Sequence, residues 1–193
     1  MKYAFRLNGI SYVMQPCNLL ITAEDEQAEP LALQIAEMIT AGNTGLNIEF
    51  YMDRIAISVI RDFYEIYANH MIGVQVGESP ADTLCETVLE DIKNRLSLFQ
   101  RSNVNTLDEY RKAVSETDMR EIFMFIQTDA VETEDGRKAF AAWNQLAAAA
   151  GIYCIVISKD EKMQDVFLNQ IEITNKNTTV HADTYVTVSA SVQ

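Results

Sequence analysis

The clearest local pattern in the chain is a short apolar strand followed at once by an amphipathic helix. Leu19–Ile21 is a continuous apolar run, typical of a buried strand. Leu31, Ile35 and Ile39 then recur at the four-residue spacing of one helix face. Strand, tight turn and helix in this order is the setting in which phosphate-binding loops occur. We therefore expect this unit to lie at the centre of the fold.

Further short strands are predicted on both sides of this unit. Asn8-Gly9 is a hairpin-turn signal, and it predicts a ribbon of two strands, Tyr3–Leu7 and Ile10–Met14. The other expected strands are Asn47–Met52, Met71–Val76, Ile122–Ile126, Ile152–Ile157, Val166–Ile173 and Thr184–Val192.

Helix signals lie between these strands. Ser79 and Pro80 suit the N-cap and first helical position of an amphipathic helix that runs to Phe99. Thr106 and Glu109 form a capping-box pattern that starts a short helix. The remaining expectations are a turn at Asp135-Gly136, a helix at Arg137–Ala150 that Gly151 ends, and an ambiguous segment, Asp53–Tyr67, that fits a helix or a strand.

The order of elements indicates an α/β fold. Apolar strands that alternate with helices predict a mostly parallel sheet with helices on both faces. The length of 193 residues suits one domain. We expect residues 1–16 to form the ribbon and residues 17–193 to form the α/β core.

Charge and composition narrow the possible functions. The chain is 48% hydrophobic and 22% charged, which is ordinary globular composition, and its net charge is −13. Duplex DNA is bound mainly through lysine and arginine, so an acidic chain without a basic run argues against direct nucleic-acid binding. There is no apolar run long enough to span a membrane, and the N-terminus lacks a signal-peptide core. We expect a cytoplasmic chain or the cytosolic part of a larger, membrane-anchored complex.

The cysteines and histidines do not suggest a metal site. Cys17, Cys85 and Cys154 lie in apolar stretches without a C-x-x-C pair, which favours buried free thiols. His70 and His181 are isolated in the sequence. We therefore expect no bound metal.

Several segments resemble a known family in their order and pattern. They are the strand at Asn18–Ile21, the helix Leu84–Phe99, the turn Ser102–Tyr110 with its Glu-Tyr pair, the strand Ile122–Asp129 and the segment Gln145–Ser158. Together they resemble the RecA-like ATPase domain of the FtsK/SpoIIIE translocases. The resemblance is greatest to the C-terminal ATPase domains of the type VII secretion motor protein, and it implies a P-loop NTPase-like fold.

The family's phosphate-binding residues are not matched. A Walker A loop has the pattern Gly-x-x-x-x-Gly-Lys-Ser/Thr, whose backbone N–H groups and lysine surround the anion. On this template Ala23 and Ala28 take the glycine places, Glu29 the lysine place and Pro30 the hydroxyl place. With Glu24, Asp25 and Glu26, the loop would offer phosphate carboxylates in place of a cation.

The residues at the Walker B positions, and at the polar positions after the next strand, also differ from those of the family. The resemblance implies two acidic residues at the end of the Ile122–Ile126 strand, where Gln127 and Thr128 stand. Asp129 lies one place further on, and a one-residue shift on a strand turns a side chain to the other face. After the next strand the family has a polar pair of the Thr-Gln or Ser-Gln type. The corresponding residues here are Ser158 and Lys159.

These departures favour a catalytically inactive ATPase-fold domain. It would serve as an interaction or regulatory module, with neighbouring ATPase domains or a secreted substrate protein as partners, and it would bind neither ATP nor magnesium. Two alternatives remain open. One is a divergent metal-dependent nucleotide hydrolase that uses Asp129 and the Glu24–Glu29 cluster, and the other is a sensor that binds a small ligand at the strand ends.

Overall fold

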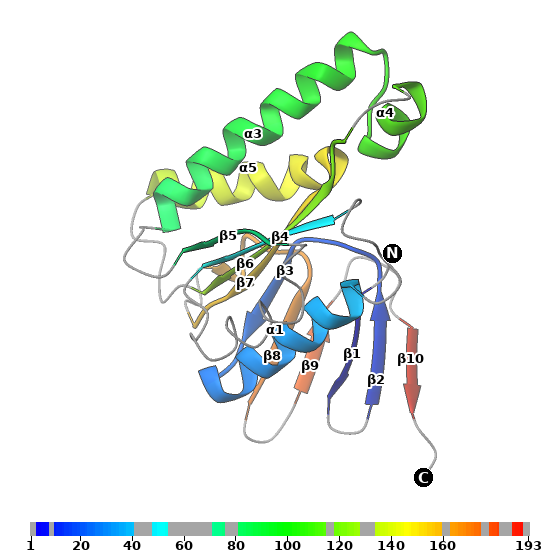
Figure 1. The fold of residues 1–193 in the computed structure, drawn as a ribbon. Coiled ribbons are helices and arrows are strands. Elements are labelled where there is room, and N and C mark those ends of the chain that lie inside the picture. Colours follow the sequence, from blue (N-terminus) through cyan, green and yellow to red (C-terminus); the bar gives the residue numbers. More distant parts are fainter. Residues whose placement is uncertain are drawn as a thin grey trace.

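The chain forms a large, mostly parallel sheet and a small antiparallel one. The computed structural model describes residues 3–7, 10–40, 48–53, 71–75, 81–114, 118–127, 134–159, 163–174, 178–181 and 187–190. The larger sheet has the strand order β5-β4-β6-β7-β3-β8-β9, and the smaller has the order β1-β2-β10 (Figure 1). The strands are β1 Tyr3–Leu7, β2 Ile10–Met14, β3 Leu19–Thr22, β4 Ile48–Asp53, β5 Met71–Gln75, β6 Glu121–Gln127, β7 Ile152–Ile157, β8 Gln170–Ile173, β9 Thr178–His181 and β10 Thr187–Ala190.

Helices cover both faces of the larger sheet. The described helices are α1 Asp25–Thr40, α3 Ala81–Arg101, α4 Leu107–Ala113 and α5 Glu134–Ala150. Helix α1 lies on one face, and α3 and α5 lie together on the other (Figure 1). Every pair of neighbouring strands in this sheet is parallel except β8 and β9. The predicted α/β fold, with a mostly parallel sheet between helices, is therefore confirmed.

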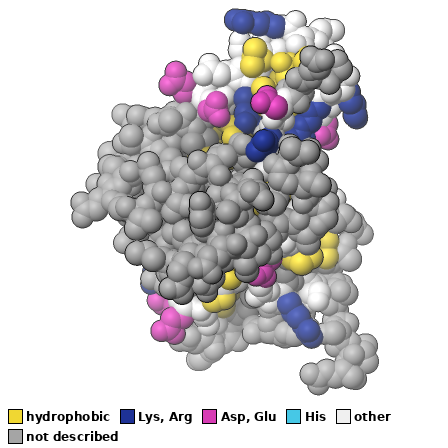
Figure 2. Space-filling view, viewed as in Figure 1, with side chains coloured by type: hydrophobic (Ala, Val, Ile, Leu, Met, Phe, Trp, Pro, Cys, Tyr) yellow, Lys and Arg dark blue, Asp and Glu magenta, His cyan; other side chains and the backbone are white. Residues whose placement is uncertain are grey.

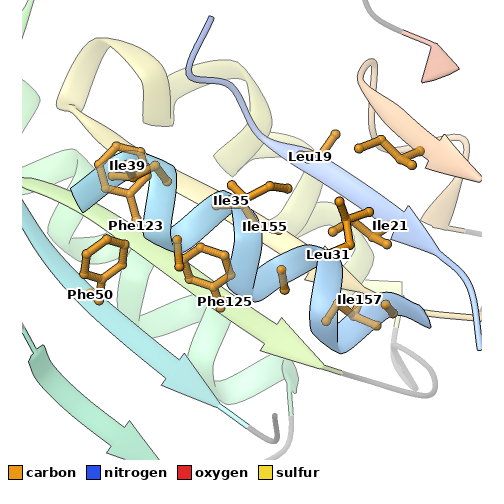
Figure 3. Packing of buried hydrophobic residues seen from close by; sticks show 14 of the residues in the cluster. Leu19, Ile21, Leu31, Ile35, Ile39, Phe50, Phe123, Phe125, Ile155 and Ile157 are labelled. Carbon is orange, nitrogen blue, oxygen red and sulfur yellow. The ribbon is translucent and has the colours of Figure 1, made fainter. Parts of the chain in front are cut away.

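Alternate side chains of the central strands pack into two separate hydrophobic cores, one on each face of the sheet. On β3, Leu19 and Ile21 belong to the cluster under α1, whereas Leu20 belongs to the cluster under α3 and α5. This follows from the strand repeat of two, since successive side chains point to opposite faces. Figure 3 shows Leu31, Ile35 and Ile39 of α1 facing the strand side chains, as their spacing predicted.

Most predicted elements have the expected positions. The ribbon pairs β1 with β2 in antiparallel register, and Gly151 ends α5 with a φ of 70°. The capping box is present, because Thr106 Oγ1 accepts from the Glu109 N–H at 3.3 Å. Glu109 also turns back, and its Oε2 accepts from the Asn105 N–H at 2.7 Å.

Two expectations about element boundaries were wrong. Asp135-Gly136 is not a turn, because both residues lie in the first turn of α5, where an acidic residue favours the helix dipole. The strand expected at Val166–Ile173 begins only at Gln170. The residues before it form turns, and the buried Phe167 packs into the α3 and α5 core instead.

The structure adds a strand to the predicted ribbon, and some of the other predictions fall on residues that it does not describe. The C-terminal strand β10 pairs with β2, so the ribbon becomes a three-stranded sheet. The expected caps Ser79 and Pro80 and most of the ambiguous Asp53–Tyr67 segment lie outside the described residues. Cys17 and Cys154 are buried free thiols, and burial raises the pKa of the Cys154 thiol. Among the described helices, none combines the length and apolar character needed to cross a bilayer.

Candidate functional site

The candidate site lies where three neighbouring parallel strands end. Strands β3, β7 and β8 are adjacent, and ligands in open α/β sheets bind outside the carboxyl ends of the strands. A pocket of about 310 Å³ opens at this edge. It is lined by Thr22, Ala23, Glu24, Gln27, Lys159, Glu172, Ile173 and Thr174.

The connection from β3 to α1 is only two residues long. Strand β3 ends at Thr22 and α1 begins at Asp25, which leaves Ala23 and Glu24 between them. The Glu24 carbonyl accepts hydrogen bonds from the N–H groups of Gln27 and Ala28, each at 2.9 Å. These N–H groups are therefore used within the first turn of the helix. A phosphate-cradling loop needs several N–H groups that point at the anion, and such a short connection leaves little backbone to supply them.

The two strand-end loops are joined by an ion pair between two residues that line the pocket. Lys159, after β7, places its Nζ 2.8 Å from Glu24 Oε2. Both side chains reach solvent, with 47% of Lys159 and 73% of Glu24 exposed. Ser158, beside Lys159, is buried, and its N–H donates to the Ile21 carbonyl at 3.1 Å. The β7 loop is thus held against the end of β3.

Four of the predicted site residues lie along the start of α1. Ala23 is buried in the connection, and Ala28 is buried within the helix. Glu29 and Pro30 also lie inside α1, in its second turn. The structure therefore brings only Ala23, of these four, into the lining of the pocket.

Of the predicted Walker B positions, the structure describes Gln127, which lies two strands away from β3. Gln127 is the last residue of β6 and is half-buried. One strand, β7, separates β6 from β3. Thr128 and Asp129 lie outside the described residues.

Sequence reasoning missed the contribution of β8 to the site. Glu172, Ile173 and Thr174 line the pocket, and β8 pairs in parallel with β3 through Leu20, Ile21 and Thr22. The Val166–Ile173 pattern did predict a strand, but nothing in it indicated that the strand lies beside β3. In the structure the Asn169 carbonyl accepts from the Leu20 N–H at 3.0 Å. This contact joins segments far apart in the chain, and no local sequence pattern indicates it.

The charges around the pocket favour a polar or cationic ligand over a phosphate chain. Glu24 and Glu172 contribute carboxylates, and the only described cation in the lining is Lys159, which is already paired with Glu24. A triphosphate entering here would compete with Glu24 for Lys159 and would face Glu172. No group of three His, Cys, Asp or Glu side chains with metal-binding geometry occurs in the described part of the chain.

Comparison with known proteins places this arrangement in a recognised fold. The cytoplasmic domain of the Thermomonospora curvata type VII secretion ATPase EccC is similar with a TM-score of 0.67 at 16% identity, over 83% of this chain. The cytoplasmic domain of EssC gives 0.68 at 13% identity over 95% of the chain. Two EccC ATPase domains solved with a signal-sequence peptide give 0.58 at 13% identity over 80%.

These likenesses confirm the fold. The chain has a RecA-like fold of the kind found in type VII secretion ATPases, as the order of its segments predicted. The matched regions cover 21%, 44% and 30% of the three solved chains, so this chain spans less than half of each. No family model and no curated protein matches the sequence.

Proposed function

We propose that this chain is a RecA-like domain that does not use ATP and acts as a protein interaction or regulatory module of a type VII secretion-type translocation motor. The observation that carries the proposal is the two-residue connection between β3 and α1. In this fold the connection would have to hold the phosphates. Here its residues begin a helix directly, and Glu24 fixes Lys159 by an ion pair.

The physical argument concerns what phosphoryl transfer requires. Catalysis of this reaction depends almost entirely on positioning and on electrostatic stabilisation by lysine, metal ions and hydrogen-bond donors. At this edge the donors of Gln27 and Ala28 are bonded within the helix. Glu29 takes the lysine place of the Walker template, and Gln127 takes a metal-carboxylate place. The lysine that would hold the phosphates and a carboxylate that would hold the metal are thus both replaced.

The comparisons support a protein partner. The similar EccC and EssC structures belong to proteins with several ATPase domains, and one contains a signal-sequence peptide. By analogy, we propose that this domain contacts either neighbouring ATPase domains or a secreted substrate protein. Its cytosolic position beside a membrane-anchored motor is part of the same proposal.

Calorimetry and a phosphate-release assay test the catalytic half of the proposal. Titration of millimolar ATP with magnesium should give no saturable heat, and no phosphate should be released with magnesium or manganese. Phosphate release that disappears in Asp129→Ala would contradict the proposal. It would support the alternative of a divergent, metal-dependent nucleotide hydrolase.

A mixing assay tests the regulatory half. The purified chain should form a complex with the active ATPase domains of the motor in its own organism and should change their rate of ATP hydrolysis. Bovine serum albumin, which is similarly acidic, is the control for nonspecific charge effects. Unchanged hydrolysis together with no complex would contradict the proposed role.

The pocket itself keeps one further alternative open. Its volume of about 310 Å³ lies at the lower end of the range for small-molecule sites. A sensor role would appear as a saturable thermal shift with a small ligand. That shift should be lost when Thr174 and Glu172, which line the pocket, are replaced by alanine.

A further inference from the structure

The pocket at the ends of β3, β7 and β8 contains a carboxylate that no described group neutralises. Glu172 is half-buried and lines the pocket. Within the described part of the chain, its side chain makes no hydrogen bond and no ion pair. Taking a charge out of water is costly unless a partner compensates it. A cation bound in the pocket would supply that partner.

Thr22 lies beside Glu172 on the same face of the sheet. The two residues are paired in the parallel register of β3 and β8. On β8, Ile171 and Ile173 pack into the core under α1, so Glu172 between them points to the other face. On β3, Ile21 likewise packs under α1, and the next residue, Thr22, points away from it. The Thr22 hydroxyl also has no hydrogen-bond partner among the described residues, so an unpaired carboxylate and an unpaired hydroxyl stand together in the pocket lining.

The other charges of the pocket leave it with one uncompensated negative charge. Lys159 Nζ lies 2.8 Å from Glu24 Oε2, so these two charges compensate each other. Glu172 remains, and the described lining residues include no second cation. Figure 2 shows further Asp and Glu side chains at the surface over the start of α1, next to this edge of the sheet. The field around the edge therefore attracts cations and repels phosphates.

The size and the apolar part of the pocket favour an organic cation over a metal ion. A volume of about 310 Å³ would hold several water molecules, each of which occupies about 30 Å³ in the liquid. Ala23 and Ile173 supply apolar surface along which an alkyl chain can lie. A metal ion instead needs several oxygen ligands close together, and no suitable group of His, Cys, Asp or Glu occurs in the ranges that the structure describes.

We propose that this pocket binds the guanidinium group of an organic ligand, with Glu172 as its anionic partner. A guanidinium is planar, its N–H groups form a fork that matches both oxygens of a carboxylate, and it is more weakly hydrated than an ammonium. Its remaining N–H groups can donate to the Thr22 hydroxyl and to the side-chain oxygen of Gln27, while its alkyl chain lies against Ile173. This role of the pocket rests on the proposed function in one respect, because ATP must not occupy the same edge.

A guanidinium can come from two sources, and two probes distinguish them. n-Propylguanidinium represents a free small molecule. The blocked peptide N-acetyl-Ala-Arg-Ala-amide carries the same group on a peptide backbone, as a protein partner would. Binding of both probes would assign the pocket to an arginine side chain, and binding of n-propylguanidinium alone would assign it to a small molecule. Either result supports the proposal.

Amide chemical shifts of the isotopically labelled natural chain measure the binding directly. Millimolar n-propylguanidinium chloride should displace the amides of Thr22–Gln27 and Glu172–Thr174 in a saturable way, relative to sodium chloride at the same ionic strength. n-Propylammonium has the same charge and chain but lacks the planar fork, and it should bind several-fold more weakly. If neither guanidinium probe gives saturable shifts at these amides, the proposal is overturned.

Matched variants test the part that each charge plays. Glu172→Gln keeps the size of the side chain and removes its charge, and it should weaken binding by at least about tenfold, because hydrogen bonds to charged groups are among the strongest. Glu26→Gln is the control, since it removes the same charge from an exposed position of α1 outside the pocket lining, and it should change the affinity little. Lys159→Gln should strengthen binding, because it leaves Glu24 available as a second anion.

The variants also contain the results that would refute this site. Equal weakening by Glu172→Gln and Glu26→Gln would reduce the effect to net charge and overturn the proposal. Weaker binding to Lys159→Gln would show that the pocket does not select a cation. Circular dichroism confirms that each variant folds, and the localised shifts of the natural chain provide a test that needs no variant.

The failure of this site and the failure of the proposed function give different results. A chain that binds neither ATP nor a guanidinium would refute the guanidinium site and leave the proposed function standing. Saturable shifts of the same amides with ATP and magnesium would refute the proposed function, and with it the premise of the guanidinium site.

Discussion

Glu24 takes part in the strand-end site through both its backbone carbonyl and its side-chain carboxylate. Its carbonyl accepts from the N–H groups of Gln27 and Ala28, the third and fourth residues of α1, and its carboxylate lies 2.8 Å from the Lys159 Nζ. The sequence analysis placed Glu24, Asp25 and Glu26 together in the loop, but of these only Glu24 lies before α1. It did not predict that α1 starts at Asp25, because turn residues and helix-starting residues share the same composition. It also gave no sign that Lys159 reaches across from β7.

Residue 151 occupies a position that only glycine suits. Its φ is 70°, and a Cβ at this position would overlap Leu107 Cδ2 and lie 3.2 Å from Leu107 Cβ. Gly151→Ala should lower the free energy of unfolding by at least about 1 to 2 kcal/mol from the left-handed backbone alone. Urea denaturation measures the change. In the Leu107→Ala background the same substitution should cost less, and a Gly151→Ala protein as stable as the natural one would contradict this account.

Tyr153 carries a pH dependence that can be measured directly. Burial first, then the negative charges of Glu121 and Asp108, raises its pKa to about 12. Its ring stacks on Phe123 with centroids 5.1 Å apart. Because the folded state favours the protonated phenol, its contribution to stability is complete below the ordinary pKa of 10.0 and is lost as pH rises through about 12.

Alkaline denaturation of matched proteins tests this sign. Between pH 10 and 12 the natural chain should lose more stability than Tyr153→Phe, which keeps the stack and has no ionisable group. Absorbance of tyrosinate should also show one phenol that ionises late. Equal losses for both proteins would show that Tyr153 does not titrate as its surroundings indicate.

At the level of elements, regular patterns were predictive and boundaries were not. The five apolar residues of Ile122–Ile126 lie within β6, buried on both faces. The capping box at Thr106 also gave the start of α4 correctly. By contrast, Asp135-Gly136 was misread because acidic residues favour both turns and first helical turns. The pairing of β10 with β2 joins segments far apart in sequence, and local patterns do not encode it.

The cap of α4 is testable because the helix has only seven residues. Thr106→Ala removes the acceptor of the Glu109 N–H and should destabilise the protein by about 1 kcal/mol. Thr106→Ser keeps the hydroxyl and should cost much less. Thermal unfolding of the three proteins gives the comparison. An alanine variant as stable as the serine variant would show that the 3.3 Å hydrogen bond contributes nothing.

Helix α1 makes a prediction about restoring the Walker pattern. Glu29→Lys with Pro30→Thr reinstates the lysine and hydroxyl, yet both positions lie in the second turn of α1. The double variant should still show no saturable heat with ATP and magnesium, because the connection before the helix is unchanged. The double variant Glu37→Lys with Met38→Thr, on exposed positions further along α1, is the control for charge. ATP binding only in the first variant would show that residue identity, and not the loop, had been limiting.

At the scale of the whole molecule, the fold resembles that of ATPase domains, and at its strand-end edge β3 is joined to α1 by a two-residue connection. The similar structures share the RecA-like arrangement at 16% identity or less. The alternation of apolar strands and helices predicted the mostly parallel sheet, and the resemblance to the FtsK/SpoIIIE ATPase domains implied the RecA-like arrangement. The residues at the Walker positions could be compared in the sequence, but the two-residue connection from β3 to α1 and the Glu24–Lys159 ion pair are visible only in the structure.

Amide chemical shifts of the isotopically labelled chain, followed as ATP and magnesium are added, test the central claim most directly. The account predicts that the amides of Thr22–Ala28 do not move beyond the small shifts that sodium triphosphate at matched ionic strength produces. A saturable displacement of these amides, specific for the nucleotide, would place its phosphates against the start of α1 and would contradict the account.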